Sequence, residues 1–120
     1  MRIVGNILRR VAKLVGPVAS VAAAGNSQGT ATALTGVVNI VSAADDTKGV
    51  VLPAGATAGE VVTVVNTVSN KVLKVYPSTG GDINNGSDNA AITMRAAQTA
   101  LFVALGSDNW GAVYDTDTTS

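Results

Sequence analysis

The chain has 120 residues, a formal net charge of zero, and neither cysteine nor histidine. This composition excludes disulfides and thiolate chemistry, and it removes the commonest general base and the commonest zinc ligand. The length is that of a single domain. One Phe, one Trp and two Tyr supply few large core side chains. We therefore expect added stability from oligomerisation or from attachment to a larger surface.

The charge is distributed unevenly along the sequence. Arg2, Arg9, Arg10 and Lys13 precede the first acidic residue, Asp45, so residues 1–44 carry a net charge of +4 and residues 45–120 a net charge of −4. A basic N-terminal part is either a solvated tail or an arm that contacts an acidic partner, such as a protein shell, a nucleic acid or a membrane surface. Because the aromatic residues do not interleave with basic ones, we expect no specific nucleic-acid binding.

Residues 2–15 have the i, i+3, i+4, i+7 periodicity of an amphipathic helix. Gly16-Pro17 ends this helix, because proline disfavours helical geometry at the residue before it. The apolar side consists of Ile3, Val4, Ile7, Leu8, Val11, Leu14 and Val15. The residues expected to bind a partner are Ile3, Ile7, Leu8, Arg9, Arg10, Val11 and Lys13.

Three interpretations of this segment remain open. The first is a docking helix that packs on its own domain or on a neighbouring subunit. The second is a secretory signal with a basic start, an apolar run over residues 14–24 and small residues at 22–24, although Lys13 and Pro17 interrupt it. The third is a helix on a membrane surface; the apolar run is too short and too interrupted to span a bilayer.

Residues 16–36 are rich in Ala, Gly, Ser and Thr and predict an extended arm or linker that becomes a strand near its end. We therefore divide the chain into an N-terminal helix and arm (1–29), a β-domain (30–114) and a polar, acidic tail (115–120).

The β-domain is predicted from short Val-, Ile-, Thr- and Tyr-rich runs separated by Gly, Pro and Asn. Spacings near those of sandwiches indicate an all-β fold, a single small antiparallel β-sandwich of jelly-roll-like type. We expect Tyr76, Phe102 and Trp110 to lie in the core, and Lys71 and Lys74 to face water. The predicted strands are 30–34, 37–42, 50–52, 60–66, 72–76, 91–94, 100–105 and 110–114.

The sequence shows little that suggests catalysis. Its carboxylates lie in turn-like sequence, where aspartate usually bonds its own backbone. Asp82, Asn84 and Asp88 alternate as calcium ligands do, but Gly86 offers no ligand and Thr93 stands where a bidentate glutamate is needed. The loop 80–89 therefore favours a plain hairpin with a turn at its Asn-Gly pair. We expect no enzymatic activity, no metal and no cofactor.

Several motifs in the β-domain resemble a group of small phage and prophage virion proteins. The resemblance covers roughly residues 25–114 and leaves out the basic N-terminal segment. The matching positions are Leu52-Pro53-Ala54, Gly59 to Asn66, Val75-Tyr76-Pro77, Ile83-Asn84 and Trp110.

The resemblance implies a capsid decoration, or cement, protein, a class that commonly acts as trimers. Its expected partner is the major capsid protein, and its expected location is the capsid surface of the virion. Comparable modules occur in tail fibres and head spikes, so a module that recognises a host surface glycan is the alternative. That alternative needs an exposed aromatic platform, which so few aromatic residues disfavour. A secreted or membrane-active protein built around residues 2–15 is the third possibility.

Overall fold

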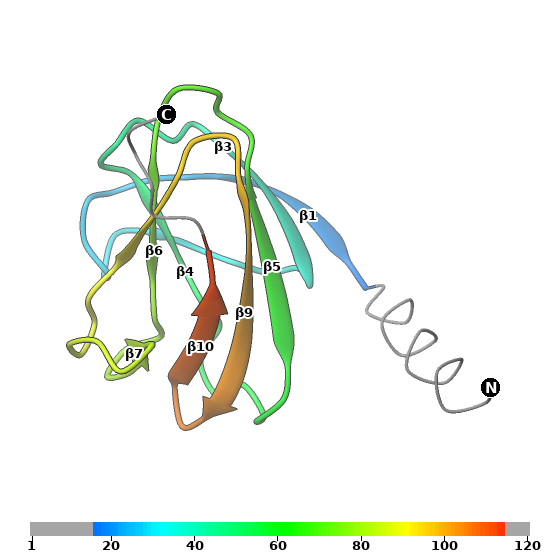
Figure 1. Ribbon diagram of the computed structural model, residues 1–120, viewed down its shortest axis with the longest axis vertical. Helices are drawn as coiled ribbons and strands as arrows, with labels where there is room; N and C mark the ends of the chain where they lie inside the picture. The colour runs from blue at the N-terminus through cyan, green and yellow to red at the C-terminus, as the bar shows by residue number, and fades with distance from the viewer. Residues whose placement is uncertain (1–15, 115–120) are drawn as a thin grey trace.

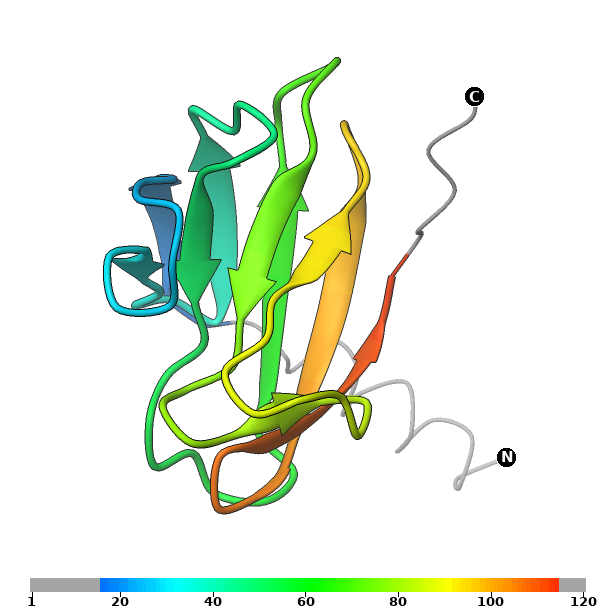
Figure 2. The same cartoon turned by 90° about the vertical axis from the view of Figure 1, so that its left-hand side faces the viewer.

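The computed structural model describes residues 16–114, which form an all-β globule of two sheets (Figures 1 and 2). The six-stranded sheet has the order β1 (Val18–Ala22), β3 (Val38–Ser42), β5 (Val61–Asn66), β9 (Thr99–Gly106), β10 (Asn109–Val113) and β7 (Asp82–Ile83). The four-stranded sheet has the order β2 (Thr32–Ala33), β4 (Gly49–Val51), β6 (Leu73–Tyr76) and β8 (Ile92–Met94). Within this part of the chain, nothing forms a helix that could cross a bilayer.

The chain winds between the two sheets. From β1 to β8 successive strands alternate, each odd strand joining the six-stranded sheet and each even strand the four-stranded one. In consequence β1, β3 and β5 are parallel neighbours, and so are β2, β4 and β6. Parallel strands need a long crossover, and here a strand of the opposite sheet lies within each crossover.

The mixed pairing corrects the antiparallel expectation. Between residues 16 and 114, antiparallel pairing is confined to β5–β9, β9–β10 and β6–β8, while five other pairs are parallel. The short connections that predicted hairpins instead carry the chain from one sheet to the other. A connection of a few residues has the same turn chemistry in both cases, so the sequence does not distinguish them.

All eight predicted strands are present, with ends shifted by one or two residues. The structure adds β7 and β1, and β1 corrects the expected arm over residues 16–36. Val18–Ala22 pairs with β3, and Val21 is buried with 7% of its surface exposed. Signal cleavage after Ala24 would remove this strand, which disfavours the secretory interpretation. The helix predicted over 2–15, the domain division at 29 and the tail 115–120 involve residues outside the described range.

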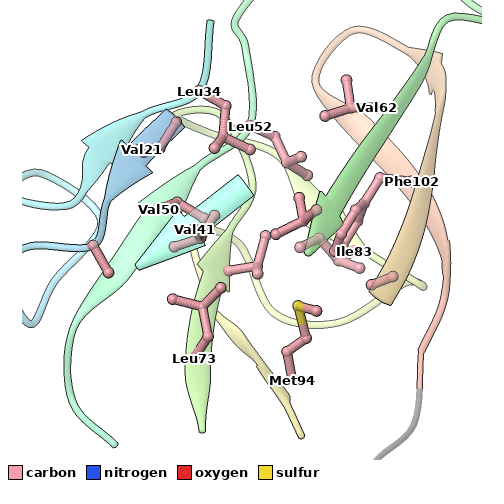
Figure 3. Packing of buried hydrophobic residues seen from close by; sticks show 14 of the residues in the cluster. Val21, Leu34, Val41, Val50, Leu52, Val62, Leu73, Ile83, Met94 and Phe102 are labelled. Carbon is pink, nitrogen blue, oxygen red and sulfur yellow. The ribbon is translucent and has the colours of Figure 1, made fainter. Parts of the chain in front are cut away.

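Side chains from both sheets meet in one core (Figure 3). The alternation of β5, in which every second residue is buried, shows why a valine-rich run forms a strand here: one face packs inward and the other faces out. Tyr76, Phe102 and Trp110 are buried, as predicted. The Nε1–H of Trp110 is buried and has no acceptor among the described residues.

Two buried asparagines fix the loops at the ends of the six-stranded sheet. The Asn39 side chain accepts a hydrogen bond from Gly36 N and donates to the carbonyls of Gly36 and Thr63. The Asn66 amide donates to the carbonyls of Lys71 and Arg95, at 2.9 and 3.3 Å. Its oxygen accepts from the backbone N–H of Val68 at 3.1 Å. These bonds satisfy backbone groups that would otherwise be costly to bury.

Candidate interaction surface

The candidate functional site is the side of the six-stranded sheet that points away from the core, termed here the outer face. It is formed by the alternate, outward-pointing residues of β1, β3, β5, β9 and β10. These strands contain no ionisable residue. The large apolar members of the outer face are Val18, Val38, Ile40, Val61, Val65, Leu101, Val103, Leu105 and Val113.

Strand register arranges these side chains in rows. One row runs across all five strands through Val18, Val38, Thr63, Leu101 and Val113, which are paired neighbours in that order. Val18 is 67% exposed and Val113 75% exposed, so both ends of the row are open to solvent. Apolar side chains of this size rarely remain in contiguous exposed patches on monomers, and such patches mark interaction sites.

A second row lies nearer the β9–β10 turn and is lower in height. It runs through Val61, Val103 and Gly111. A Cβ added at Gly111 would lie 3.4 Å from Val103 Cγ1 and 3.8 Å from Leu105 Cδ2. The two side chains therefore border a position with no side chain of its own, while Leu105 is 62% exposed.

The corresponding side of the four-stranded sheet has a different chemistry. Lys74 of β6 points outward there, and its Nζ donates a hydrogen bond of 2.7 Å to Thr93 Oγ1 of β8. Tyr76 lies against Gly49, where an added Cβ would be 2.7 Å from the Tyr76 ring. This side is thus polar and filled by its own residues, so the outer face is the apolar one of the two.

Acidic residues gather at the end of the domain where β5 begins, termed here the acidic end. Glu60 directly precedes β5, Asp82 pairs in register with Asn109, and Asp108 lies in the β9–β10 turn. Asp88 joins them because Asn89 N donates to Gly81 O. These loops meet at the bottom of Figure 2.

The basic residues of the described range lie elsewhere. Lys48 and Lys71 are at the opposite end, paired with Asp45 at 3.9 Å and with Asp46 at 3.5 Å. The carbonyl of Arg95 contacts Asn66, where β5 finishes, and Lys74 lies on the four-stranded sheet. Within residues 16–114 the acidic end therefore has four carboxylates and no basic side chain.

Two carboxylates serve as hydrogen-bond acceptors for loops. Asp45 Oδ1 accepts from the Thr47 hydroxyl at 2.8 Å and from the N–H groups of Lys48 and Thr47, and these bonds lower the pKa of Asp45. Asp108 Oδ1 accepts from the Ser78 hydroxyl at 2.7 Å and from Gly55 N, which lowers the pKa of Asp108. Bonds to the ionised form favour it, so these groups stabilise loops as anions.

The loop 80–89 is not the predicted hairpin. β7 pairs with β10 of one sheet while β8 belongs to the other sheet. The tight turn is centred on Asn84 and Asn85, both at positive φ, and is closed by the bond from Gly86 N to Ile83 O. Asn84 Oδ1 accepts from Ala112 N. Residues 16–114 contain no group of three His, Cys, Asp or Glu side chains that could hold a metal ion.

The structure does not place the partner-binding residues predicted from the sequence, because all of them lie within residues 2–15. The outer face was missed by sequence reasoning, although its signal is present: long strands without any charge. Alternating strands such as 61–66 predict one buried face, but the other face was assigned to solvent without regard to its composition. Five such strands side by side give a surface that single-strand analysis does not reveal.

No family model matches this chain, and neither curated proteins nor solved structures show a significant match to it. The argument for function therefore rests on the surface described above and on the sequence motifs.

Proposed function

We propose that this chain is a phage capsid decoration protein, which binds the assembled lattice of the major capsid protein and stabilises the shell without catalysis. The observation that carries the proposal is the outer face, five adjacent strands with no charged residue and with open apolar side chains. A surface of this kind serves contact with protein. The virion motifs across residues 25–114 give the contact its biological setting.

The stabilisation follows from mass action. A protein that binds the closed shell and not the free subunits lowers the free energy of the shell by RT ln(1 + [L]/Kd), where [L] is its free concentration. A homotrimer on the capsid surface fits a chain with few large core side chains, since association adds buried area. The contact residues are the N-terminal Ile3, Ile7, Leu8, Arg9, Arg10, Val11 and Lys13, together with the outer face.

The finer description of the fold belongs to the same proposal. Two sheets that share one core favour a β-sandwich, with an N-terminal helix attached to its edge strand. The parallel pairing of β1, β3 and β5 argues against the jelly-roll variant, because jelly rolls are double sheets of Greek keys built from antiparallel strands.

Quantitative mass spectrometry of purified particles tests the function. The expected result is a copy number in a simple ratio to the major capsid protein over the whole shell. A few copies per particle would indicate a fibre or spike, and complete absence from particles would exclude the virion role.

The glycan-binding alternative receives no support from the aromatic residues. Trp110 is fully buried and Tyr76 is 9% exposed, so neither offers a stacking surface. Glycan-array binding that is lost in Trp110→Ala, with folding retained, would favour this alternative.

A further inference from the structure

The outer face begins at the strand where the described chain starts. β1 is the edge strand of the six-stranded sheet (Figure 1), and only Gly16 and Pro17 separate it from the segment 2–15. The Pro17 carbonyl accepts from the N–H groups of Val37 and Val38 at 2.9 and 3.2 Å. The origin of the segment is thus fixed beside the first residues of β3.

Register places this origin level with the lower row of the outer face. Val18 is level with Thr63 through Val38, so Gly16, two residues earlier, is level with Val61. Across the sheet from Val61 lie Val103 and then Gly111, where the missing side chain leaves room for an approaching element. A segment that crosses the sheet from Gly16 therefore follows a shallow path with apolar borders.

The length of the segment matches the width of the face. Fourteen residues in a helix extend about 21 Å. Five strands are separated by four spacings of about 4.8 Å, or about 19 Å in total. A helix over residues 2–15 therefore extends from β1 to β10, and its seven apolar residues repeat along one side over that whole length.

Charge favours the same location. Residues 1–15 carry four basic side chains and no acidic one, and the acidic end carries four carboxylates beside the lower row. Attraction between them acts over about 10 Å at moderate ionic strength, which is enough to orient a tethered segment. The tether also keeps the segment at a high effective concentration near its own sheet.

We propose that residues 2–15 form a helix that lies across the outer face of the same chain, with Ile3, Ile7, Leu8 and Val11 against the sheet and Arg9, Arg10 and Lys13 toward solvent. The assignment rests on the outer face and the adjoining segment, and it holds whatever the protein attaches to. It gives the most exposed apolar surface of the described domain a cover from within the chain.

Paramagnetic relaxation in the full-length protein tests the proposal. The chain has no cysteine, so Val113→Cys provides a single site for a spin label on the strand farthest from the tether. The expected result is a loss of amide signal for residues 3–15, and no such loss with the label at Lys74→Cys on the four-stranded sheet. Retention of these signals with the Val113→Cys label would overturn the proposal.

Two further samples separate the possible occupants and the chemistry. Isotope-labelled protein mixed with spin-labelled, isotope-free protein should keep its signals; signal loss in that mixture would show that a second copy covers the face and would refute docking within one chain. Adding Leu8→Glu to the spin-labelled protein should restore the signals of residues 3–15, because the substitution charges the apolar side. Asn6→Gln, on the polar side, is the control and should leave the loss unchanged.

Discussion

The hydroxyl of Ser78 donates a hydrogen bond of 2.7 Å to the carboxylate of Asp108, and so joins the β6–β7 loop to the β9–β10 turn. The same carboxylate oxygen accepts from Gly55 N at 3.2 Å, which adds the loop that precedes β5. Three loops distant in sequence therefore share one anion. Because Gly81 also lies against the Asp108 backbone with no room for a Cβ, this end of the domain has a well-defined geometry.

The Asp108 carboxylate should make stability depend on pH. Its hydrogen bonds hold the folded-state pKa below the ordinary value of about 4, so its contribution is fully present above about pH 4 and is lost as pH falls through the lower folded-state pKa. Asp108→Asn should lower the melting temperature at neutral pH and reduce the further loss in acid. Thermal melts over this pH range measure both effects.

The control for this prediction is Asp88→Asn, which changes an exposed loop carboxylate at the same end of the domain. It should leave the acid-side slope as in the unaltered protein. The slope of Asp108→Asn should not vanish, because Asp45 also has a lowered pKa and loses its loop bonds in the same range. Identical pH profiles for Asp108→Asn and the unaltered protein would contradict the prediction.

Gly49 lies where β4 passes beneath Tyr76. A Cβ at this position would be 2.7 Å from the Tyr76 ring and 2.8 Å from the Lys74 carbonyl, so Gly49→Ala forces the ring or the strand to shift. Overpacking of this kind should lower the free energy of unfolding by roughly 1–3 kcal/mol in urea denaturation. Gly29→Ala, in open space, should change it by less than about 0.5 kcal/mol. Equal effects of the two substitutions would refute this packing.

The same strands show how far the sequence predicts this fold. The positions of eight strands and the three aromatic core residues follow from local composition and alternation. The sheet to which each strand belongs does not, because that depends on which distant strand supplies hydrogen bonds. Thr32–Ala33 and Gly49–Val51, for example, are adjacent only because the intervening β3 lies in the other sheet.

The two missed strands have specific reasons. Val18–Ala22 is Ala- and Ser-rich, so its composition indicates a linker, and it forms a strand because β3 supplies a parallel partner. Asp82–Ile83 is two residues long and pairs with β10 through Ile83 and Trp110, a contact remote in sequence. Tertiary pairing determines both, which is the usual limit of β propensity.

Asn66 should be the most sensitive polar residue of the core. It is 1% exposed and makes three hydrogen bonds to backbone groups of the loops around it. Asn66→Ala leaves those groups without a partner and should cost about 1–3 kcal/mol of unfolding free energy. Chemical denaturation followed by circular dichroism measures it. Asn70→Ala, in the exposed neighbouring turn, is the control, and an unchanged midpoint for Asn66→Ala would show that the loops do not depend on these bonds.

Trp110 is the only tryptophan and is fully buried, so its fluorescence reports on the core. In the native protein we expect blue-shifted emission and little quenching by acrylamide, because the indole is out of contact with solvent. Unfolding should shift the emission to the red and make the indole accessible to the quencher. Strong quenching in the folded protein would place the ring at the surface and would revive the glycan-stacking alternative.

Two N-terminal deletions separate the segment from the domain. Deletion of residues 1–15 leaves β1 intact, so the protein should keep its β-sheet circular dichroism and cooperative unfolding. Deletion of residues 1–24 also removes β1, with the buried Val21 and Ala23, and leaves β3 as an exposed edge. Loss of this apolar burial should cost about 2 kcal/mol or more beyond the shorter deletion. If both variants unfold at the same denaturant concentration, β1 contributes nothing to the domain, and the boundary belongs near residue 30 as the sequence alone predicts.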